Sequence, residues 1–223
     1  MICFMLDVGT RMFTFVHWKT EVLLENLVDT LITFIQFMDS EWRQQKFKKC
    51  ERLLFFLSSD KLVVSSGQDG LINFWDQREK SVSFTLEPYK NANINRPNFG
   101  KWIGSASINN EWVATGGGPR LALYHLRNRQ PFQIFDFPKE IHVTSFIEDN
   151  VLAGGESNIL AQYSLTGDTI SEIITSGPSI LSVAWQLTPN CKILTACGAS
   201  NKIDVTTNFN YKDTTLNFYG KKF

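Results

Sequence analysis

Residues 61–76 read KLVVSSGQDGLINFWD, and this stretch decides the fold. It contains an apolar run, a tight turn at Asp69-Gly70 and a second, alternating run that ends in Trp75-Asp76. Asp and Gly tolerate the positive φ angles of hairpin turns, and alternation of apolar with polar residues indicates a strand with one buried face. A strand that ends in Trp-Asp is typical of a blade of a WD-repeat propeller. We therefore expect Asp69, Gly70, Trp75 and Asp76 to be structural residues.

The same pattern recurs three more times along the chain. The further copies are EWVATGGGPRLALYHL at 111–126, NVLAGGESNILAQYSL at 150–165 and KILTACGASNKIDVTT at 192–207. A glycine closes the first run of each copy (Gly67, Gly116, Gly155, Gly198), and the residue eight places later is the second anchor (Trp75, Tyr124, Tyr163, Thr206). The glycines lie 49, 39 and 43 residues apart. These intervals bracket the period of about 40 to 45 residues that WD-repeat blades show.

Each copy is expected to form four short strands. In the third copy, alternating runs span 141–147, 151–155, 159–165 and 169–175, and short polar turns separate them. Four-stranded sheets arranged around an axis make a β-propeller, and known propellers have about 4 to 8 blades. The sequence therefore predicts an all-β domain over residues 53–219 with about four blades.

Residues 1–52 show none of this repeat. Apolar residues recur at helical spacing (Leu24, Leu27, Val28, Leu31, Ile35, Met38), which predicts an amphipathic helix in a separate, non-repeat segment. A basic stretch follows at 43–52, for which a solvated helix face is favoured over a nuclear-localisation or RNA-facing patch. In a ring of more than four blades, the outer blades would have unpaired edges, and the helical segment is a candidate cover for one of them.

The composition argues against several functional classes. Lys and Arg together number 22, as do Asp and Glu, so binding to nucleic acid through charge alone is not expected. Asp7 lies in the first apolar stretch, and Glu25 and Asp29 interrupt the longest one, so neither a secretory signal nor a membrane span is expected. The four cysteines form no close pair, which predicts reduced thiols in place of a zinc site.

No catalytic motif is recognisable. The three histidines have no nucleophile elbow or H-E-x-x-H pattern beside them, and His125 is expected to form a blade-end hydrogen bond. Pro-Arg follows Gly116-Gly117-Gly118 where a phosphate-binding loop needs Gly-Lys, so these glycines predict a strand turn. We expect no enzyme activity, no cofactor, no metal site and no small-molecule substrate.

The longest insertion in the repeat lies at 88–101, between the first two copies. In and beside it, Arg96, Phe99, Lys101 and Trp102 combine charge with aromatic surface, the composition that is enriched at interface hot spots. These four residues are the predicted partner-binding site, although Trp102 could equally begin a buried strand.

Several motifs along residues 53–219, about three quarters of the chain, resemble the THO complex subunit 6 family of WD-repeat proteins. They are EPYK at 87–90, NRP at 95–97, GKWIG at 100–104, GGGP at 116–119, LALYHLR at 121–127, HVT at 142–144 and the stretch 205–211. The WD pattern alone is common to many families, whereas the Arg-Pro loop, GKWIG and GGGP in this order are specific.

The resemblance implies a nuclear, seven-bladed propeller in the THO part of the transcription-export (TREX) complex. That complex couples transcription and processing of messenger RNA to its export. A member of this family would act as a scaffold for protein–protein interaction, docking on other THO subunits and meeting RNA only through the complex. The chain departs from the family at its front, where the first three blades are expected and residues 1–52 stand instead.

A second hypothesis comes from another functional class. WD propellers also serve as substrate receptors of cullin-type ubiquitin ligases, which share a W-D-x-R ending. Residues 75–78 match that tetrapeptide once. Affinity purification distinguishes the two hypotheses, because the first predicts THO subunits as partners and the second predicts a cullin adaptor.

Overall fold

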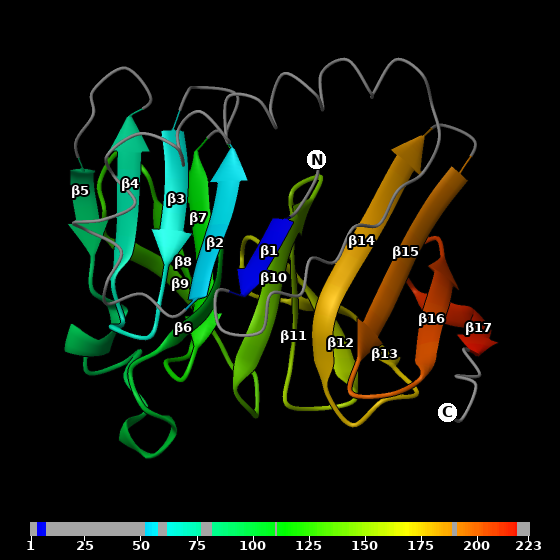
Figure 1. Ribbon diagram of the computed structural model, residues 1–223. Coiled ribbons are helices and arrows are strands. Elements are labelled where there is room, and N and C mark those ends of the chain that lie inside the picture. Colours follow the sequence, from blue (N-terminus) through cyan, green and yellow to red (C-terminus); the bar gives the residue numbers. More distant parts are fainter. Residues whose placement is uncertain are drawn as a thin grey trace.

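The computed structural model describes residues 4–7, 52–57, 62–76, 82–109, 111–188 and 191–217. They form antiparallel sheets that lie side by side, with two short 3-10 helices at the lower left of Figure 1. The predicted all-β propeller architecture is confirmed. The predicted helix at 24–38 lies outside the described residues, as do the basic residues from Arg43 to Lys49. Within the described residues, no helix has the length and hydropathy needed to cross a membrane.

Four successive blades run from β2 to β17. The first contains β2 (Arg52–Leu57), β3 (Leu62–Ser66), β4 (Ile72–Asp76) and β5 (Val82–Leu86). The second contains β6 (Ile103–Ile108), β7 (Trp112–Gly117), β8 (Leu121–His125) and β9 (Pro131–Phe135). The third contains β10 (Ile141–Ile147), β11 (Asn150–Gly155), β12 (Ile159–Ser164) and β13 (Thr169–Ile174). The fourth contains β14 (Ile180–Thr188), β15 (Cys191–Gly198), β16 (Lys202–Thr207) and β17 (Tyr211–Asn217). Strand order within each sheet follows the sequence, so each blade is an antiparallel meander.

The strands of the third blade agree with the four predicted runs to within one residue at each end. One strand lies inside the segment that the sequence separated from the repeat. It is β1 (Phe4–Asp7), which pairs antiparallel with β2 and places Phe4 opposite Phe55. The first sheet therefore has five strands.

Strand register identifies the equivalent positions in the four blades. The second anchors pair with Val63, Val113, Val151 and Leu194 on the neighbouring strand. Counting four residues onward from these partners gives Gly67, Gly117, Gly155 and Gly198. In the second blade the counterpart is thus Gly117, and the register moves the anchor by one residue from Gly116. Between these paired positions, the hairpin of β7 and β8 is one residue shorter than the corresponding hairpins of the other three blades.

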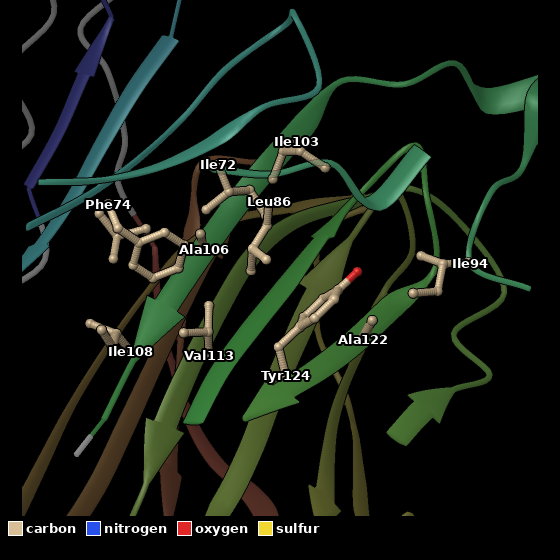
Figure 2. Packing of buried hydrophobic residues seen from close by; sticks show 11 residues of the cluster. Ile72, Phe74, Leu86, Ile94, Ile103, Ala106, Ile108, Val113, Ala122 and Tyr124 are labelled. Atoms are coloured by element: carbon tan, nitrogen blue, oxygen red, sulfur yellow. The ribbon is translucent and has the colours of Figure 1, made fainter. Parts of the chain in front are cut away.

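Hydrophobic cores lie between neighbouring blades. Ile72, Phe74 and Leu86 of the first blade pack against residues of the second, including Tyr124 (Figure 2). Tyr163 of the third blade likewise belongs to the core shared with the second. The tyrosine anchors therefore face the preceding blade. Burial raises the pKa of Tyr124 far above its ordinary value, and burial together with nearby carboxylates raises the pKa of Tyr163 to about 12.

Trp75 holds the equivalent anchor position in the first blade. It is 4% exposed, and its indole Nε1 donates a hydrogen bond to Ser65 Oγ at 2.9 Å. Before it, the turn at Asp69-Gly70 has the predicted form. Gly70 has φ +80°, its N–H donates to Gly67 O at 3.2 Å, and Asp69 Oδ1 accepts from Leu71 N–H. These hydrogen bonds join residues within the first blade.

A buried carboxylate joins the fourth blade to the segment that leads into it. Asp204 on β16 is 2% exposed and accepts hydrogen bonds from Ser176 N–H, from Ser176 Oγ at 2.7 Å and from Thr215 Oγ1 at 2.8 Å. Lys212 Nζ lies 3.7 Å away. Burial acts to raise the pKa of Asp204, but the hydrogen bonds from Ser176 and Thr215 and the charge of Lys212 outweigh it and leave the pKa lowered.

Replacing Asp204 by asparagine should lower the free energy of unfolding at pH 7 by about 2 kcal/mol, since an amide NH2 would face the Ser176 donors. A lowered folded-state pKa stabilises the fold above the ordinary carboxyl pKa of 3.8, and the contribution is lost as the pH falls through the folded-state pKa. The difference between wild type and Asp204→Asn should therefore persist in urea titrations at pH 7 and pH 5 and shrink at pH 3. Asp213→Asn, at an exposed site on β17, is the control. An undiminished difference at pH 3 would contradict the assignment.

Candidate partner-binding loop

The connection between the first and second blades, residues 87–102, is ordered by two short helices. These are η1 (Pro88–Lys90) and η2 (Pro97–Phe99), and each begins with a proline whose fixed φ suits a first helical position. Between them, Ile94 is fully buried in the first core, and its carbonyl accepts a hydrogen bond from Arg120 N–H at 2.8 Å. The loop is thus attached to the second blade at its midpoint.

The start of the loop carries an exposed ionic cluster. Lys90 Nζ lies 2.6 Å from Glu87 Oε2, and the Tyr89 hydroxyl donates to Glu87 Oε1 at 3.0 Å. The hydrogen bond with Lys90 lowers the pKa of Glu87, and the same bond raises the pKa of Lys90. Ion pairs at the surface contribute little to stability, so this cluster mainly orients the chain.

Arg96 is the most highly connected side chain of the loop. Its Nε donates to Gly118 O at 2.8 Å, its Nη1 to Phe137 O at 3.1 Å and its Nη2 to Lys139 O at 2.9 Å. Nη2 also lies 3.2 Å from Gly117 O and 3.3 Å from Pro119 O. Burial lowers the pKa of Arg96, and neighbouring Arg120 lowers it further, but a guanidinium remains charged in proteins. Arg96 therefore fastens the loop to the turn between β7 and β8 and to the segment that enters the third blade.

Phe99 and Trp102 complete the attachment. The Arg96 guanidinium carbon lies 4.7 Å from the centre of the Phe99 ring. Trp102 Nε1 donates to Phe99 O at 2.9 Å, and its ring stacks on His142 with the ring centres 5.5 Å apart. His142 Nε2 lies 3.0 Å from Glu156 Oε2. Half-buried Trp102 thus lies immediately before β6 and contacts the third blade.

Part of the loop is exposed to solvent around its second helix. Pro97, Asn98, Gly100 and Lys101 are exposed, and Lys101 Nζ lies 5.4 Å from the centre of the Tyr89 ring. The structure brings all four predicted residues into one loop, but it uses Arg96 and Trp102 for internal contacts. Of the four predicted residues, Lys101 and the partly exposed Phe99 are open to solvent beside Asn98. Lys90, Ala92 and Asn93, near the first helix of the loop, are exposed as well.

The loop lies at the end of the blades where the turns between second and third strands also lie. Ile103 N–H donates to Gly67 O, and Gly118 N–H donates to Trp102 O. On the same end, an open hollow between the third and fourth blades is lined by Lys139, Glu156, Ser157, Asn158 and Thr175 to Pro178. Sequence reasoning missed this hollow. The sequence did contain a sign of it, because these residues lie in the turns and connections of successive repeats. In a propeller, equivalent turns of neighbouring blades lie at the same end.

The histidines and cysteines that the structure describes have structural surroundings. His125 Nδ1 accepts a hydrogen bond from Arg127 N–H at 3.1 Å, which is the expected blade-end hydrogen bond. Cys197 is a free thiol, and burial raises its pKa. Among the residues described, no three His, Cys, Asp or Glu side chains come together as a metal-binding group.

Comparison with curated proteins finds relatives that share one name. The chain is 35% identical over 158 residues to "THO complex subunit 6" of Drosophila melanogaster, an alignment that covers 71% of this chain and 45% of that protein. It is 38% identical over 160 residues to "THO complex subunit 6" of Homo sapiens, covering 70% of this chain and 47% of that protein. It is 32% identical over 167 residues to "THO complex subunit 6 homolog" of Danio rerio, covering 74% and 51%. No family model matches the chain. The chain thus spans about half the length of these relatives, and the resemblance seen in its sequence motifs is confirmed.

Proposed function

Because about 70% of this chain is homologous to proteins named THO complex subunit 6, we propose that it is a non-catalytic scaffold subunit of a THO complex. Its partners are other THO subunits, and it meets RNA only through them. In this role it acts in the nucleus, where the complex couples transcription and processing of messenger RNA to its export. The homology to several proteins of one name is the observation that carries the proposal.

The shape of the chain supports a scaffold role. Its four blades correspond to part of a larger ring, which the family resemblance implies has seven blades. The alignments cover 45% to 51% of each relative, which is compatible with a chain that contains four of seven blades. Propellers present loops on a rigid framework, and binding residues of scaffolded folds are concentrated on such loops.

The loop around Lys101 is the proposed docking surface for a THO subunit. Arg96 holds its backbone through several carbonyl contacts, so little conformational entropy is lost when a partner binds. Lys101 and Asn98 are exposed, and Phe99 offers an aromatic edge beside them. A rigid aromatic group flanked by a cation is typical of interface hot spots.

Replacing Asn98 and Lys101 together by glutamate should reduce recovery of THO subunits with the tagged chain by about tenfold, since the new carboxylates would repel a partner that suits a cation. The measurement is quantitative co-purification from cells at matched expression. Lys192→Glu reverses an exposed charge at the opposite end of the fourth blade and is the control. Equal recovery of THO subunits with the double variant and the wild type, at equal thermal stability, would remove the loop from the interface.

The alternative of a ubiquitin-ligase receptor has no support from the relatives described above. Of its tetrapeptide, Gln77 and Arg78 lie outside the described residues. The same purification tests it, because a cullin adaptor in place of THO subunits would favour it.

A further inference from the structure

The outer strand of the third blade, β13, carries exposed apolar side chains. Ile170 is 47% exposed and Ile174 is 66% exposed, which makes Ile174 the most exposed large hydrophobic residue in the described part of the chain. The third blade shares a hydrophobic core with the second blade and another with the fourth. Because it has a neighbouring blade on each side, a missing blade does not cause this exposure.

The edge of β13 also lacks the protection that the other outer strands have. Lysine, proline or a covering group blunts an edge strand, which otherwise pairs with another chain. β9 begins at Pro131, β17 carries Lys212, and the guanidinium carbon of Arg129 lies 4.3 Å from the centre of the Phe84 ring on β5. β13 reads TISEII, has none of these features and is rich in β-branched residues, which favour strands. The bulge in its pairing occurs in all four blades and so does not distinguish it.

Strand pairing places Glu172 and Ile174 next to each other on one face of β13. Ile174 lies opposite Ile159 on β12, and Glu172 lies opposite Ala161. Ala161 belongs to the core shared with the second blade, and Ile159 packs against that core. Side chains at i and i+2 of a strand share a face, so a carboxylate lies beside the exposed isoleucine on the side of the second blade.

The Glu172 carboxylate is available to a cation from outside. Glu172 and Asp136 both raise the pKa of Tyr163, which places the two carboxylates on the same side of the third blade. Arg120 forms an ion pair with Asp136 at 2.9 Å, whereas no ion pair or hydrogen bond among the described residues involves the Glu172 carboxylate. Lys212, on the neighbouring outer strand, has its Nζ 3.7 Å from the buried carboxylate of the fourth blade. A cation would therefore meet Glu172 without displacing an internal partner.

We propose that β13 receives an extended segment of a partner protein as an additional strand at the edge of the third blade. Main-chain hydrogen bonds of the added strand satisfy the free edge, and its side chains at alternate positions provide selectivity. A lysine or arginine lies beside Glu172, and an apolar residue two positions away packs on Ile174. The partner segment thus alternates apolar and basic residues on one face.

A protein segment fits this edge better than a nucleic acid or a second copy of the chain. A nucleic acid has no regular series of amide and carbonyl groups to pair with a strand, and Glu172 and Asp136 would repel its phosphates. Pairing of β13 with β13 of a second copy would bring two Glu172 carboxylates onto one strand pair, where like charges destabilise.

Fluorescence anisotropy with the full chain and the fluorescein-labelled octapeptide Thr-Ile-Thr-Lys-Thr-Ile-Thr-Lys tests the side-chain contacts. The peptide should bind the wild type, and Glu172→Lys should weaken binding by about tenfold. A peptide with glutamate in place of lysine should bind Glu172→Lys more tightly than the wild type, which also shows that this variant is folded. Ile174→Thr keeps a β-branched residue and should weaken binding by about fivefold. Asp213→Lys, a matched charge reversal at an exposed site on β17, should bind like the wild type.

The pairing of the two backbones has its own test. A strand added at an edge donates the N–H groups of alternate residues to that edge, whereas the other N–H groups face solvent. N-methylation of one alternate set of peptide amides should therefore block binding. Methylation of the other set should leave the affinity within about twofold of the unmodified peptide.

Three results would overturn the proposal: no binding by the wild type at about 1 mM peptide, equal affinity of Glu172→Lys and the wild type, or equal affinity for the two methylated peptides. Light scattering covers the remaining occupant. A dimer of the wild type that Ile174→Thr dissociates would assign the edge to a second copy and overturn the proposal as well. These results are independent of THO subunit recovery, so they leave the proposed function untouched.

Discussion

Replacing Gly155 by alanine is expected to lower the free energy of unfolding by about 3 kcal/mol or more, or to prevent folding. A Cβ atom at this position would lie 1.8 Å from Glu140 O, far inside van der Waals contact. That carbonyl also accepts a hydrogen bond from Glu156 N–H at 2.9 Å, so it cannot move away without losing this bond. Urea denaturation followed by tryptophan fluorescence measures the change.

The same replacement should be damaging at the equivalent places in the neighbouring blades. A Cβ at Gly198 would lie 1.8 Å from Ser179 O, and one at Gly117 would lie 2.2 Å from Trp102 O. Gly177→Ala is the matched control, because its nearest neighbour is the Ser200 hydroxyl at 3.2 Å, which can rotate. It should change the free energy of unfolding by only about 0.5 kcal/mol. Similar stability of Gly155→Ala and Gly177→Ala would mean that the close backbone crossing is absent.

Replacing Arg96 by alanine should cost about 3 kcal/mol of unfolding free energy, since several carbonyl groups would lose a charged donor. Lysine at this position keeps the charge but not the planar set of donors, so Arg96→Lys should recover only part of the loss. The urea midpoint of each variant measures the effect.

Lys101→Ala, two residues after the end of η2, should stay within about 0.5 kcal/mol of the wild type because Lys101 is exposed. An equally small effect of Arg96→Ala would contradict the structural role of its hydrogen bonds. Arg96 is expected to affect stability, so a loss of partner binding by an Arg96 variant does not separate docking from folding. The same loss in a Lys101 variant reports on docking.

The strands were predictable because their signal is local. Period-two alternation recurs in every blade, and in the third blade it places all four strands within one residue of their observed ends. The Asp69-Gly70 turn was likewise readable from two residues, one of which has φ +80°. The hairpin of β7 and β8 is one residue shorter than the others, and the sequence did not show this difference. The sequence therefore assigned the anchor of the second blade to Gly116, whereas the strand register places it at Gly117.

The candidate site was only partly predictable. The sequence placed Arg96, Phe99, Lys101 and Trp102 in one inserted loop, and they do lie there. It did not show that Arg96 holds the loop through internal hydrogen bonds while Lys101 stays exposed. The carbonyl acceptors of Arg96 lie 21 to 43 residues further along the chain. The contact between Arg129 and the Phe84 ring was missed for the same reason, since Phe84 belongs to another blade.

By itself, then, the sequence determined the blade architecture and the family relationship of this protein. Strand alternation, turn residues and motif order depend only on residues that are close together in the chain. The tertiary structure alone decided which glycines face a crossing backbone and which arginine holds the loop through internal hydrogen bonds. Those properties depend on contacts between neighbouring blades, where residues far apart in the chain meet, and no local pattern specifies which atoms will lie within hydrogen-bonding distance.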